Sequence, residues 1–531
     1  MAAVALVTGF AAAIRLPALR ALPIFGDEAI ILRLARIIRS EPSDQLWSPL
    51  LVPYAPLHPW LLALFLPVSS DPVRSGRLFS ILCGVLLVPT LAWVAWRLGE
   101  VLTAERDRIS TATALTAATL VATSPFFVFS DRIARVDSLF ALETALAAGL
   151  SISMATRASW RSSILFGLLM GMTMLTRQAV SYPLWVLPLA ASLLCRPAEG
   201  RRSVSRGILL AIPVALVLWV PMLLAPGSTD LMTRIFHVSM SRPSLGFADR
   251  VELVARNIGI AGAAFWTYLT PPGCVMALAG LAIAAVTRRR LFWFLAAWGA
   301  IVLLPPVLFA GNYFPRYALP GALPLLVAGA LAVASARARW GRSFAASLVA
   351  AVVVWGLIDV WRGVTDWRRW RLLPLDHMQF VSGWSAGYAS ERAADYLVEV
   401  SRKTPIWVIL PKVSGNPSDA LWLRLEKDPN VRLFYAEDFL NLPVLAPTDA
   451  GHVRLQGDIW AGRPIESVHL DPASSVLFVS TDPVFLGHAG WASAASVVLP
   501  RNPGARILAR FENPPAAETA RPNAVLVFRV Q

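Results

Sequence analysis

The sequence predicts a polytopic α-helical membrane protein of about eleven transmembrane helices, followed by a soluble α/β domain. Three observations predict this fold class. The 531-residue chain is 56% hydrophobic and 15% charged, whereas soluble domains carry about a quarter charged residues. Apolar residues gather in runs of about twenty, the length that crosses a bilayer core. Beyond residue 361, charges become frequent and the apolar runs shorten to the length of strands.

The predicted membrane domain covers residues 1–361. Its apolar runs lie near 2–22, 78–98, 111–130, 135–155, 162–177, 179–195, 207–225, 259–286, 291–310, 317–335 and 344–361. Only Thr176, Arg177 and Gln178 separate the fifth run from the sixth, which predicts a tight hairpin. Basic residues come only after the first run and not before it, so we expect an uncleaved first helix.

The predicted soluble domain covers residues 362–531. Strand-length apolar runs lie at 406–410, 431–435, 475–479 and 525–530, and helical spacing lies at 391–400 and 418–425. This mixture predicts a small α/β domain.

The placement of arginine predicts how the chain crosses the membrane. One alternate set of short loops carries most of the short-loop arginines, and the positive-inside rule assigns these loops to the cytoplasm. They hold Arg106, Arg108, Arg157, Arg161, Arg196, Arg201, Arg202, Arg206, Arg288, Arg289, Arg290, Arg337, Arg339 and Arg342. In the inner (cytoplasmic) membrane, the N-terminus is then cytoplasmic, while loops 23–77 and 226–258 and the C-terminal domain are extracytoplasmic. The net charge of +15 follows mainly from this topology, so we expect no nucleic-acid partner.

The first outside loop opens with a pair of carboxylates, Asp27 and Glu28. The helical pattern that follows has isoleucines and leucine on one side and Arg33, Arg36 and Arg39 on the other, which predicts a helix in the membrane interface. The carboxylates either cap this helix or supply a general base.

Further ionisable residues lie where the fourth predicted helix begins. Asp131 and Arg135 are one turn apart and can pair, while Arg135 and Asp137 head an apolar span, where ionisable groups usually face a cavity or a partner. Glu143, deeper in that span, is either a site residue or an internal hydrogen-bonding partner, and we favour the second role.

Two arginines, Arg177 and Arg316, stand at the outer ends of other predicted helices. Each either snorkels to the interface or aims a cation at a phosphate. A transferase that uses a polyprenyl-phosphate sugar needs a carboxylate base and cations for the leaving phosphate, all at the level of the lipid head group. The predicted topology puts these carboxylates and cations at one membrane face.

Four motifs carry a family resemblance over about residues 1–340. They are GDEA at 26–29 with AR at 35–36 and PLHPW at 56–60; SP at 124–125 with ARVD at 134–137; Gly167 and Gly171 with LTR at 175–177; and RYALP at 316–320. In order and spacing they resemble the GT-C glycosyltransferases, in the branch of the dolichyl-phosphate-mannose protein mannosyltransferases and the bacterial aminoarabinose–lipid A transferase.

The resemblance implies roles for these residues. Asp27 would be the catalytic base, and Glu28 would support it or contact the acceptor. Arg177, where the family usually has lysine, would bind the lipid phosphate. The remaining motif residues would belong to the donor site or to its structure: Arg135, Asp137, Arg316 and Tyr317.

Acceptor recognition is less defined. The lysine that the aminoarabinose enzyme places before its prolines has no counterpart near Tyr54, although His58 would substitute in part unless it is a packing residue. A segment containing Trp384 and Tyr388 resembles a "gW.aGyG" stretch of bacterial members. It either lines the acceptor site or docks the C-terminal domain, and docking is our expectation.

The sequence thus predicts a membrane glycosyltransferase (hexosyl- or pentosyltransferase). It would move a sugar with inversion from a polyprenyl-phosphate donor to an envelope glycolipid, polysaccharide or protein. A lipid or sugar transporter or flippase would instead show internal repeats and charges at the bilayer midplane, and a non-catalytic envelope scaffold would tolerate changes at Asp27.

The three cysteines lack metal-ligand spacing. Mg²⁺ or Mn²⁺ is compatible with Asp27, Glu28 and Asp137, but arginine alone can handle the phosphate, so we expect no obligatory metal.

Overall fold

A computed structural model describes twelve stretches of the chain. These are residues 2–50, 54–102, 106–157, 159–195, 197–225, 246–412, 415–436, 452–469, 475–485, 491–501, 505–515 and 522–529. The chain divides into two compact units. Unit 1 comprises Met1–Ala21, Pro49–His58 and Gly76–Leu373, and unit 2 comprises Leu22–Ser48, Pro59–Ser75 and Pro374–Gln531. Most of the predicted outside loop 23–77 thus belongs to unit 2, whereas most of the predicted loop 226–258 lies outside the described residues.

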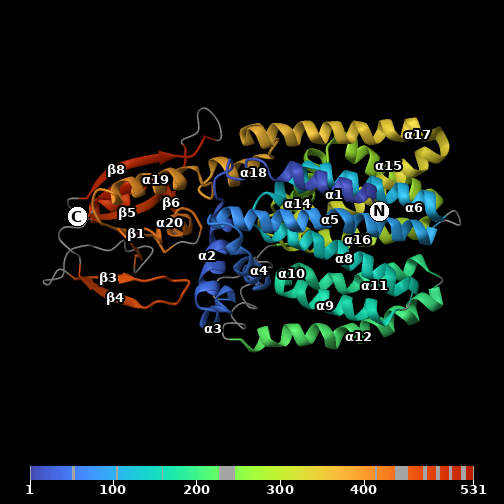
Figure 1. Ribbon diagram of the computed structural model, residues 1–531, viewed down its shortest axis with the longest axis horizontal. Coiled ribbons are helices and arrows are strands. Elements are labelled where there is room, and N and C mark those ends of the chain that lie inside the picture. Colours follow the sequence, from blue (N-terminus) through green and yellow to red (C-terminus); the bar gives the residue numbers. More distant parts are fainter. Residues whose placement is uncertain are drawn as a thin grey trace. The chain divides into compact units, whose positions relative to one another are not determined.

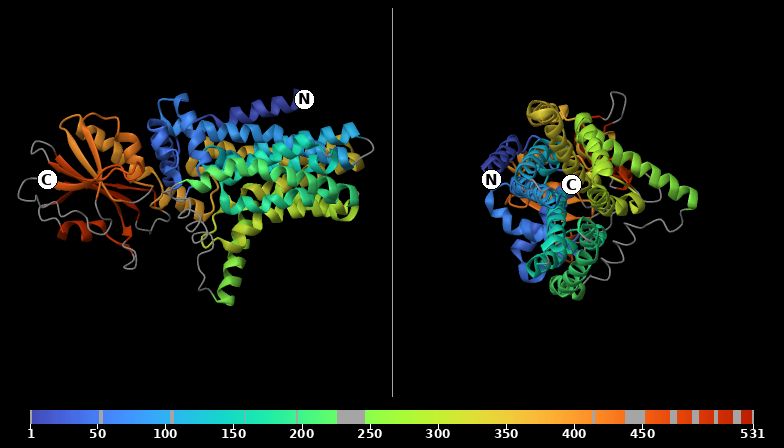
Figure 2. Two further views of the ribbon diagram at one scale, coloured as in Figure 1. Left: turned by 90° about the horizontal axis from the view of Figure 1, so that it is seen from below. Right: turned by 90° about the vertical axis from the view of Figure 1, so that its right-hand side faces the viewer.

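Unit 1 is built of helices, most of which run alongside one another, while α14 points away from them (Figures 1 and 2). They are α1 (Ala2–Arg15), α5 (Pro72–Leu102, which begins in unit 2), α6 (Arg106–Thr123), α7 (Pro125–Asp131), α8 (Val136–Arg157), α9 (Trp160–Thr176), α10 (Gln178–Ser181), α11 (Leu187–Ala191), α12 (Pro197–Leu224), α14 (Phe247–Tyr268), α15 (Pro271–Thr287), α16 (Arg289–Phe309) and α17 (Leu319–Thr365). Within the described residues, five helices are long and apolar enough to span a membrane, or up to seven if each sharply bent pair counts as one span. The protein is therefore a multi-pass helical membrane protein, as predicted.

Two predicted spans are not single helices. The run at 259–286 is divided between α14 and α15, which are bent by 112°. Thr270 has a φ of 68° at the break and is followed by Pro271, whose ring restricts the residue before it. The run at 179–195 is divided into α10, the 3₁₀ turns Tyr182–Val186 and Ser192–Leu194, and α11. Uncharged prolines leave a run apolar while interrupting its helix, which is why hydropathy missed both breaks.

Small residues let the membrane helices pack closely. A Cβ on Gly167 of α9 would lie 2.5 Å from the Ala211 carbonyl oxygen of α12, and one on Gly280 of α15 would lie 1.9 Å from the Ala328 carbonyl oxygen of α17. Such small-residue contacts are the usual means by which membrane helices associate. Gly167, which belongs to one of the four motifs, thus has a packing role.

The helices of unit 2 come from both ends of the chain. They are α2 (Gly26–Ser40), α3 (Pro42–Gln45), most of α4 (Leu57–Phe65), α18 (Pro374–His377), the π-helix Met378–Ser382, α19 (Tyr388–Ser401), α20 (Ser418–Leu425) and α21 (Ala494–Arg501). The sequence pattern predicted α19 and α20 closely because their buried residues recur at helical spacing.

A seven-stranded mixed sheet forms the centre of the C-terminal part of unit 2. Its strands are β1 (Ile406–Leu410), β2 (Val431–Tyr435), β3 (His452–Gln456), β4 (Ile465–His469), β5 (Ser475–Asp482), β8 (Arg506–Glu512) and β9 (Ala524–Arg529), in the order β4-β3-β2-β1-β5-β9-β8. Strand β1 is parallel to β2 and β5, and the other pairs are antiparallel. Strands β6 (Val484–Phe485) and β7 (Trp491–Ala492) form a separate hairpin.

The sheet is covered on both faces. Leu397 of α19 and Leu421 of α20 pack with Val408 of β1 in one buried cluster. Ile409, also of β1, packs with Val498 of α21 in another. This arrangement explains why β1 reads as an unbroken apolar run, since a strand buried on both faces has no polar side. The predicted α/β domain is confirmed in its element types.

Candidate active-site residues

The predicted base lies at the beginning of α2 in unit 2. Phe25 is in an extended conformation, and the helix begins at Gly26, so Asp27 and Glu28 stand in its first turn. Glu28 is fully buried, and its Oε2 accepts a hydrogen bond of 3.2 Å from the Phe25 backbone N–H. Glu28 therefore has the capping role that the sequence allowed. Asp27 is half-buried.

The start of α2 is held by the segment that contains Trp384 and Tyr388. The Gly26 N–H donates to the Ser385 carbonyl at 3.0 Å, and Asn416 Nδ2 donates to the Ser385 and Ile24 carbonyls at 2.8 and 3.1 Å. A Cβ on Gly387 would lie 2.1 Å from the Ile24 carbonyl oxygen, so this close approach requires glycine. All these contacts lie within unit 2, so the docking role expected for this segment stays a prediction.

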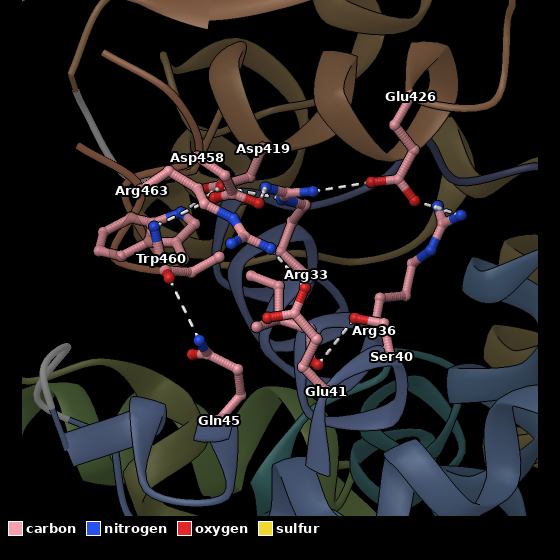
Figure 3. A network of polar contacts seen from close by, with 12 residues as sticks. Arg33, Arg36, Ser40, Glu41, Gln45, Asp419, Glu426, Asp458, Trp460 and Arg463 are labelled. Atoms are coloured by element: carbon pink, nitrogen blue, oxygen red, sulfur yellow. Dashed lines mark hydrogen bonds and ion pairs between the residues drawn. The ribbon is translucent and has the colours of Figure 1, made fainter. Parts of the chain in front are cut away.

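A buried ion network continues from the middle of α2 (Figure 3). Arg33, 1% exposed, has its Nη1 2.7 Å from Glu426 and its Nη2 2.5 Å from Asp458, while its Nε is 3.9 Å from Asp419. Its guanidinium also lies 4.5 Å from the centroid of the Trp422 ring. The polar face of α2 thus packs on α20. The expectation that this helix lies in the membrane interface stays a prediction.

Asp419 connects this network with the loop beneath Gly26. Its Oδ2 accepts a 2.6 Å hydrogen bond from the Gly415 N–H, and its Oδ1 accepts one of 2.7 Å from Trp460 Nε1. Burial raises the pKa of the Asp419 carboxyl to about 6, although Arg33 acts in the opposite direction. The same loop places Gly415, at a φ of 91°, in van der Waals contact with Gly26. The network and the start of α2 therefore form one connected structure.

A separate cluster of cations lies in unit 1. Asp137, at the start of α8, is 3.0 Å from Arg135 and 3.0 Å from Arg177. The guanidinium groups of Arg177 and Arg316 lie 4.8 and 5.4 Å from the centroid of the Tyr317 ring. The structure thus brings together all five residues predicted for the donor site. A cluster of three arginines with one carboxylate keeps a positive charge excess and suits an anionic group.

The other predicted residues have simpler surroundings. His58 is buried, with its ring 5.8 Å from that of Phe79, and its nitrogens form no hydrogen bond with any part of the chain that the structure describes. Tyr54 and Tyr388 are half-buried, and Trp384 is exposed. These surroundings leave the proposed acceptor contacts as predictions.

Two further carboxylates of the α7–α8 region are internal partners. Glu143 accepts a 2.7 Å hydrogen bond from Thr176 of the neighbouring helix, in agreement with the role we favoured. Asp131 does not form the pair with Arg135 that the sequence allowed. It binds Arg15 of α1 at 2.8 Å instead, and both side chains are fully buried. The chain turns between Asp131 and the start of α8, so the helical spacing assumed for that pair does not apply.

No group of three or more histidine, cysteine or acidic side chains is close enough to hold a metal ion among the residues that the structure describes.

The structure defines a multi-pass helical membrane protein with a C-terminal α/β domain. The chain is similar in structure to ArnT from Cupriavidus metallidurans bound to undecaprenyl phosphate, with a TM-score of 0.60 and 14% identity over 99% of this chain and 97% of that one. For ArnT in the apo state, the TM-score is 0.56 with 15% identity, over 99% and 96% of the two chains. The family model described as dolichyl-phosphate-mannose-protein mannosyltransferase matches residues 52–224. A comparison with curated protein sequences found no match.

Proposed function

We propose that this protein is a membrane glycosyltransferase that moves a sugar from a polyprenyl-phosphate donor to an acceptor of the cell envelope. The observation that carries the proposal is the cluster of Arg135, Arg177 and Arg316 around Asp137, on a fold like that of ArnT. ArnT was crystallised with undecaprenyl phosphate, a lipid phosphate of the class proposed here.

In the proposed reaction, an acceptor hydroxyl attacks the anomeric carbon of the sugar. The new glycosidic C–O bond forms as the bond between the anomeric carbon and the phosphate oxygen breaks, so the configuration inverts. Asp27 takes the hydroxyl proton, and the polyprenyl phosphate leaves with the bonding electron pair. Arg177 and Arg316 stabilise the charge on the departing phosphate. Asp137 orients Arg177 through their 3.0 Å ion pair.

The proposal includes the topology predicted from the sequence. About eleven spans would put the N-terminus in the cytoplasm, with the C-terminal domain and the reaction at the extracytoplasmic face of the cytoplasmic membrane. His58, Tyr54, Trp384 and Tyr388 would contact the acceptor or shape its loop. The acceptor would be a glycolipid, polysaccharide or protein of the envelope.

The test is mass spectrometry of envelope lipids and glycans from cells that carry the wild type or Asp27→Asn. We expect one glycan to lose a single sugar while its polyprenyl-phosphate donor accumulates. Asp44→Asn is the matched control because Asp44 is an exposed carboxylate of the same loop. Full transfer by folded Asp27→Asn protein would refute the role of Asp27, and a complete glycan on the wrong side of the membrane would identify a flippase.

The phosphate-binding role has its own test in purified protein. Arg177→Ala should raise the donor concentration needed for half-maximal transfer by at least about tenfold, because a charge-assisted hydrogen bond is lost. Arg289→Ala is the control, since Arg289 is an exposed arginine at the start of α16. Equal donor dependence in the two variants would remove Arg177 from the donor site.

A further inference from the structure

A second cationic site lies within unit 2, apart from the residues assigned to transfer. A pocket of about 390 Å³ is lined by Arg36 and Arg39 near the end of α2, by Lys427 just after α20, and by residues that lead into α5. The complete lining is Arg36, Arg39, Ser40, Leu66, Pro67, Ser69, Ser70, Pro72 and Lys427. Its volume is in the usual range for binding small molecules or head groups.

The charge of this lining has one sign. Three cations and three serines line the pocket, and none of its lining residues is acidic. Arg36 is fixed by its ion pair with Glu426 and by a 3.1 Å hydrogen bond to the Leu423 carbonyl. Arg39 donates only a long, 3.4 Å hydrogen bond to the Ala63 carbonyl, and exposed Lys427 forms no ion pair with the residues that the structure describes. Two of the three cations therefore have no carboxylate partner among the described residues.

Helix capping explains only part of this arrangement. Arg39 and Lys427 follow the rule that cations stabilise the C-terminal ends of helices, here of α2 and α20. The N-terminus of α5 at Pro72 adds no free donor, because Asp71 Oδ1 already accepts a 3.0 Å hydrogen bond from the Val73 N–H. Capping of α2 and α20 does not, however, require Arg36, Arg39 and Lys427 to line one pocket, and their shared positive charge favours a bound anion.

The position of the pocket indicates where the anion comes from. Pro72 is also the first residue of a candidate membrane span, Pro72–Glu100, so the pocket lies at the level of lipid head groups. On the segment that includes Leu66 and Pro67, the side chains of Leu64 and Val68 are 77% and 56% exposed. Exposed apolar side chains beside a cationic pocket suit a ligand that has both an acyl chain and an anionic group.

We propose that this pocket binds the phosphoryl head group of an anionic membrane lipid. Arg39 and Lys427 would contact the phosphate oxygens, Arg36 would supply a fixed positive charge, and the serines would donate hydrogen bonds. Leu64 and Val68 would lie against the acyl region. The site goes beyond the proposed transfer reaction, because none of these residues has a role in it.

The experiment uses the full-length protein in nanodiscs that contain phosphatidylglycerol or only phosphatidylcholine, with retained lipid measured by native mass spectrometry. The double variant Arg39→Gln/Lys427→Gln should retain phosphatidylglycerol at least about tenfold less well than wild type, since each surface cation contributes to attraction of anionic lipid. The control Arg402→Gln/Lys403→Gln removes the same charge from exposed positions of the same unit and should bind as wild type does.

Three outcomes would overturn the proposal. The first is equal retention in the pocket and control variants, with both proteins folded by their melting temperatures. The second is equal retention of phosphatidylcholine and phosphatidylglycerol by the wild type. The third is displacement of the lipid by inorganic phosphate at comparable concentration, which would identify a free-phosphate site. Because the readout is lipid retention, the result is independent of whether the protein transfers a sugar.

Discussion

Replacement of Arg33 by methionine tests whether the buried network holds α2 in place. The change keeps an unbranched side chain of similar length but removes the guanidinium shared by Asp419, Glu426 and Asp458. Leaving a buried charge without its partner typically costs about 3–5 kcal/mol. Glu426 and Asp458 are 21% and 16% exposed, so water can replace part of the lost attraction. Asp419 is fully buried and cannot be hydrated in this way. We therefore expect a cost at the lower end, about 3 kcal/mol.

Hydrogen–deuterium exchange of full-length protein measures this cost where it acts. A loss of about 3 kcal/mol in local stability should speed exchange in α2 and α20 by about 100-fold. The control is Arg424→Met on α20. The 3.3 Å pair of Arg424 with Asp395 is largely exposed and should contribute less than about 1 kcal/mol. In the Arg33→Met background, Asp419→Asn should recover part of the loss, because a neutral amide needs no counter-ion. Equal exchange in Arg33→Met and Arg424→Met would refute this account of the network.

Two further predictions concern the same unit. Because the pKa of Asp419 is raised from 3.8 to about 6, the folded unit binds the proton more tightly than the unfolded chain does. The stabilisation from protonated Asp419 is therefore complete below pH 3.8 and is lost as the pH rises through 6. Protection of α20 should fall over this range in the wild type and fall less in Asp419→Asn, where Glu426, whose pKa burial also raises, still titrates. Gly387→Ala should destabilise the start of α2 by about 1–3 kcal/mol, because its Cβ would lie 2.1 Å from the Ile24 carbonyl oxygen. Gly259→Ala, with no neighbouring atom within 4 Å of the added Cβ, is the control, and an equal effect on melting temperature would contradict the packing argument.

The proximity of the five residues assigned to the proposed donor site was predictable from the sequence. These residues come from motifs far apart in the chain, and the structure puts Arg135, Asp137, Arg177, Arg316 and Tyr317 together. Motif order and spacing predicted this grouping. Local charge alone did not, because arginines that snorkel independently to the interface would show the same local pattern. The pairing of Asp131 with Arg135, which the sequence allowed, was wrong. It assumed a local helical spacing where the chain turns, and Asp131 binds Arg15 instead.

The sequence by itself determined the class of protein and the kinds of its elements. Long apolar runs and strand-length runs depend on local composition, and local composition is enough to separate membrane helices from an α/β domain. Only the tertiary structure decided that Arg33 meets Asp419, Glu426 and Asp458, some four hundred residues away. The pattern around Arg33 is that of any amphipathic helix with a polar face, and such a pattern does not distinguish a face turned to water from one buried against a partner. That choice depends on which carboxylates the folded chain brings opposite the helix, and no local sequence window contains both sides of the contact.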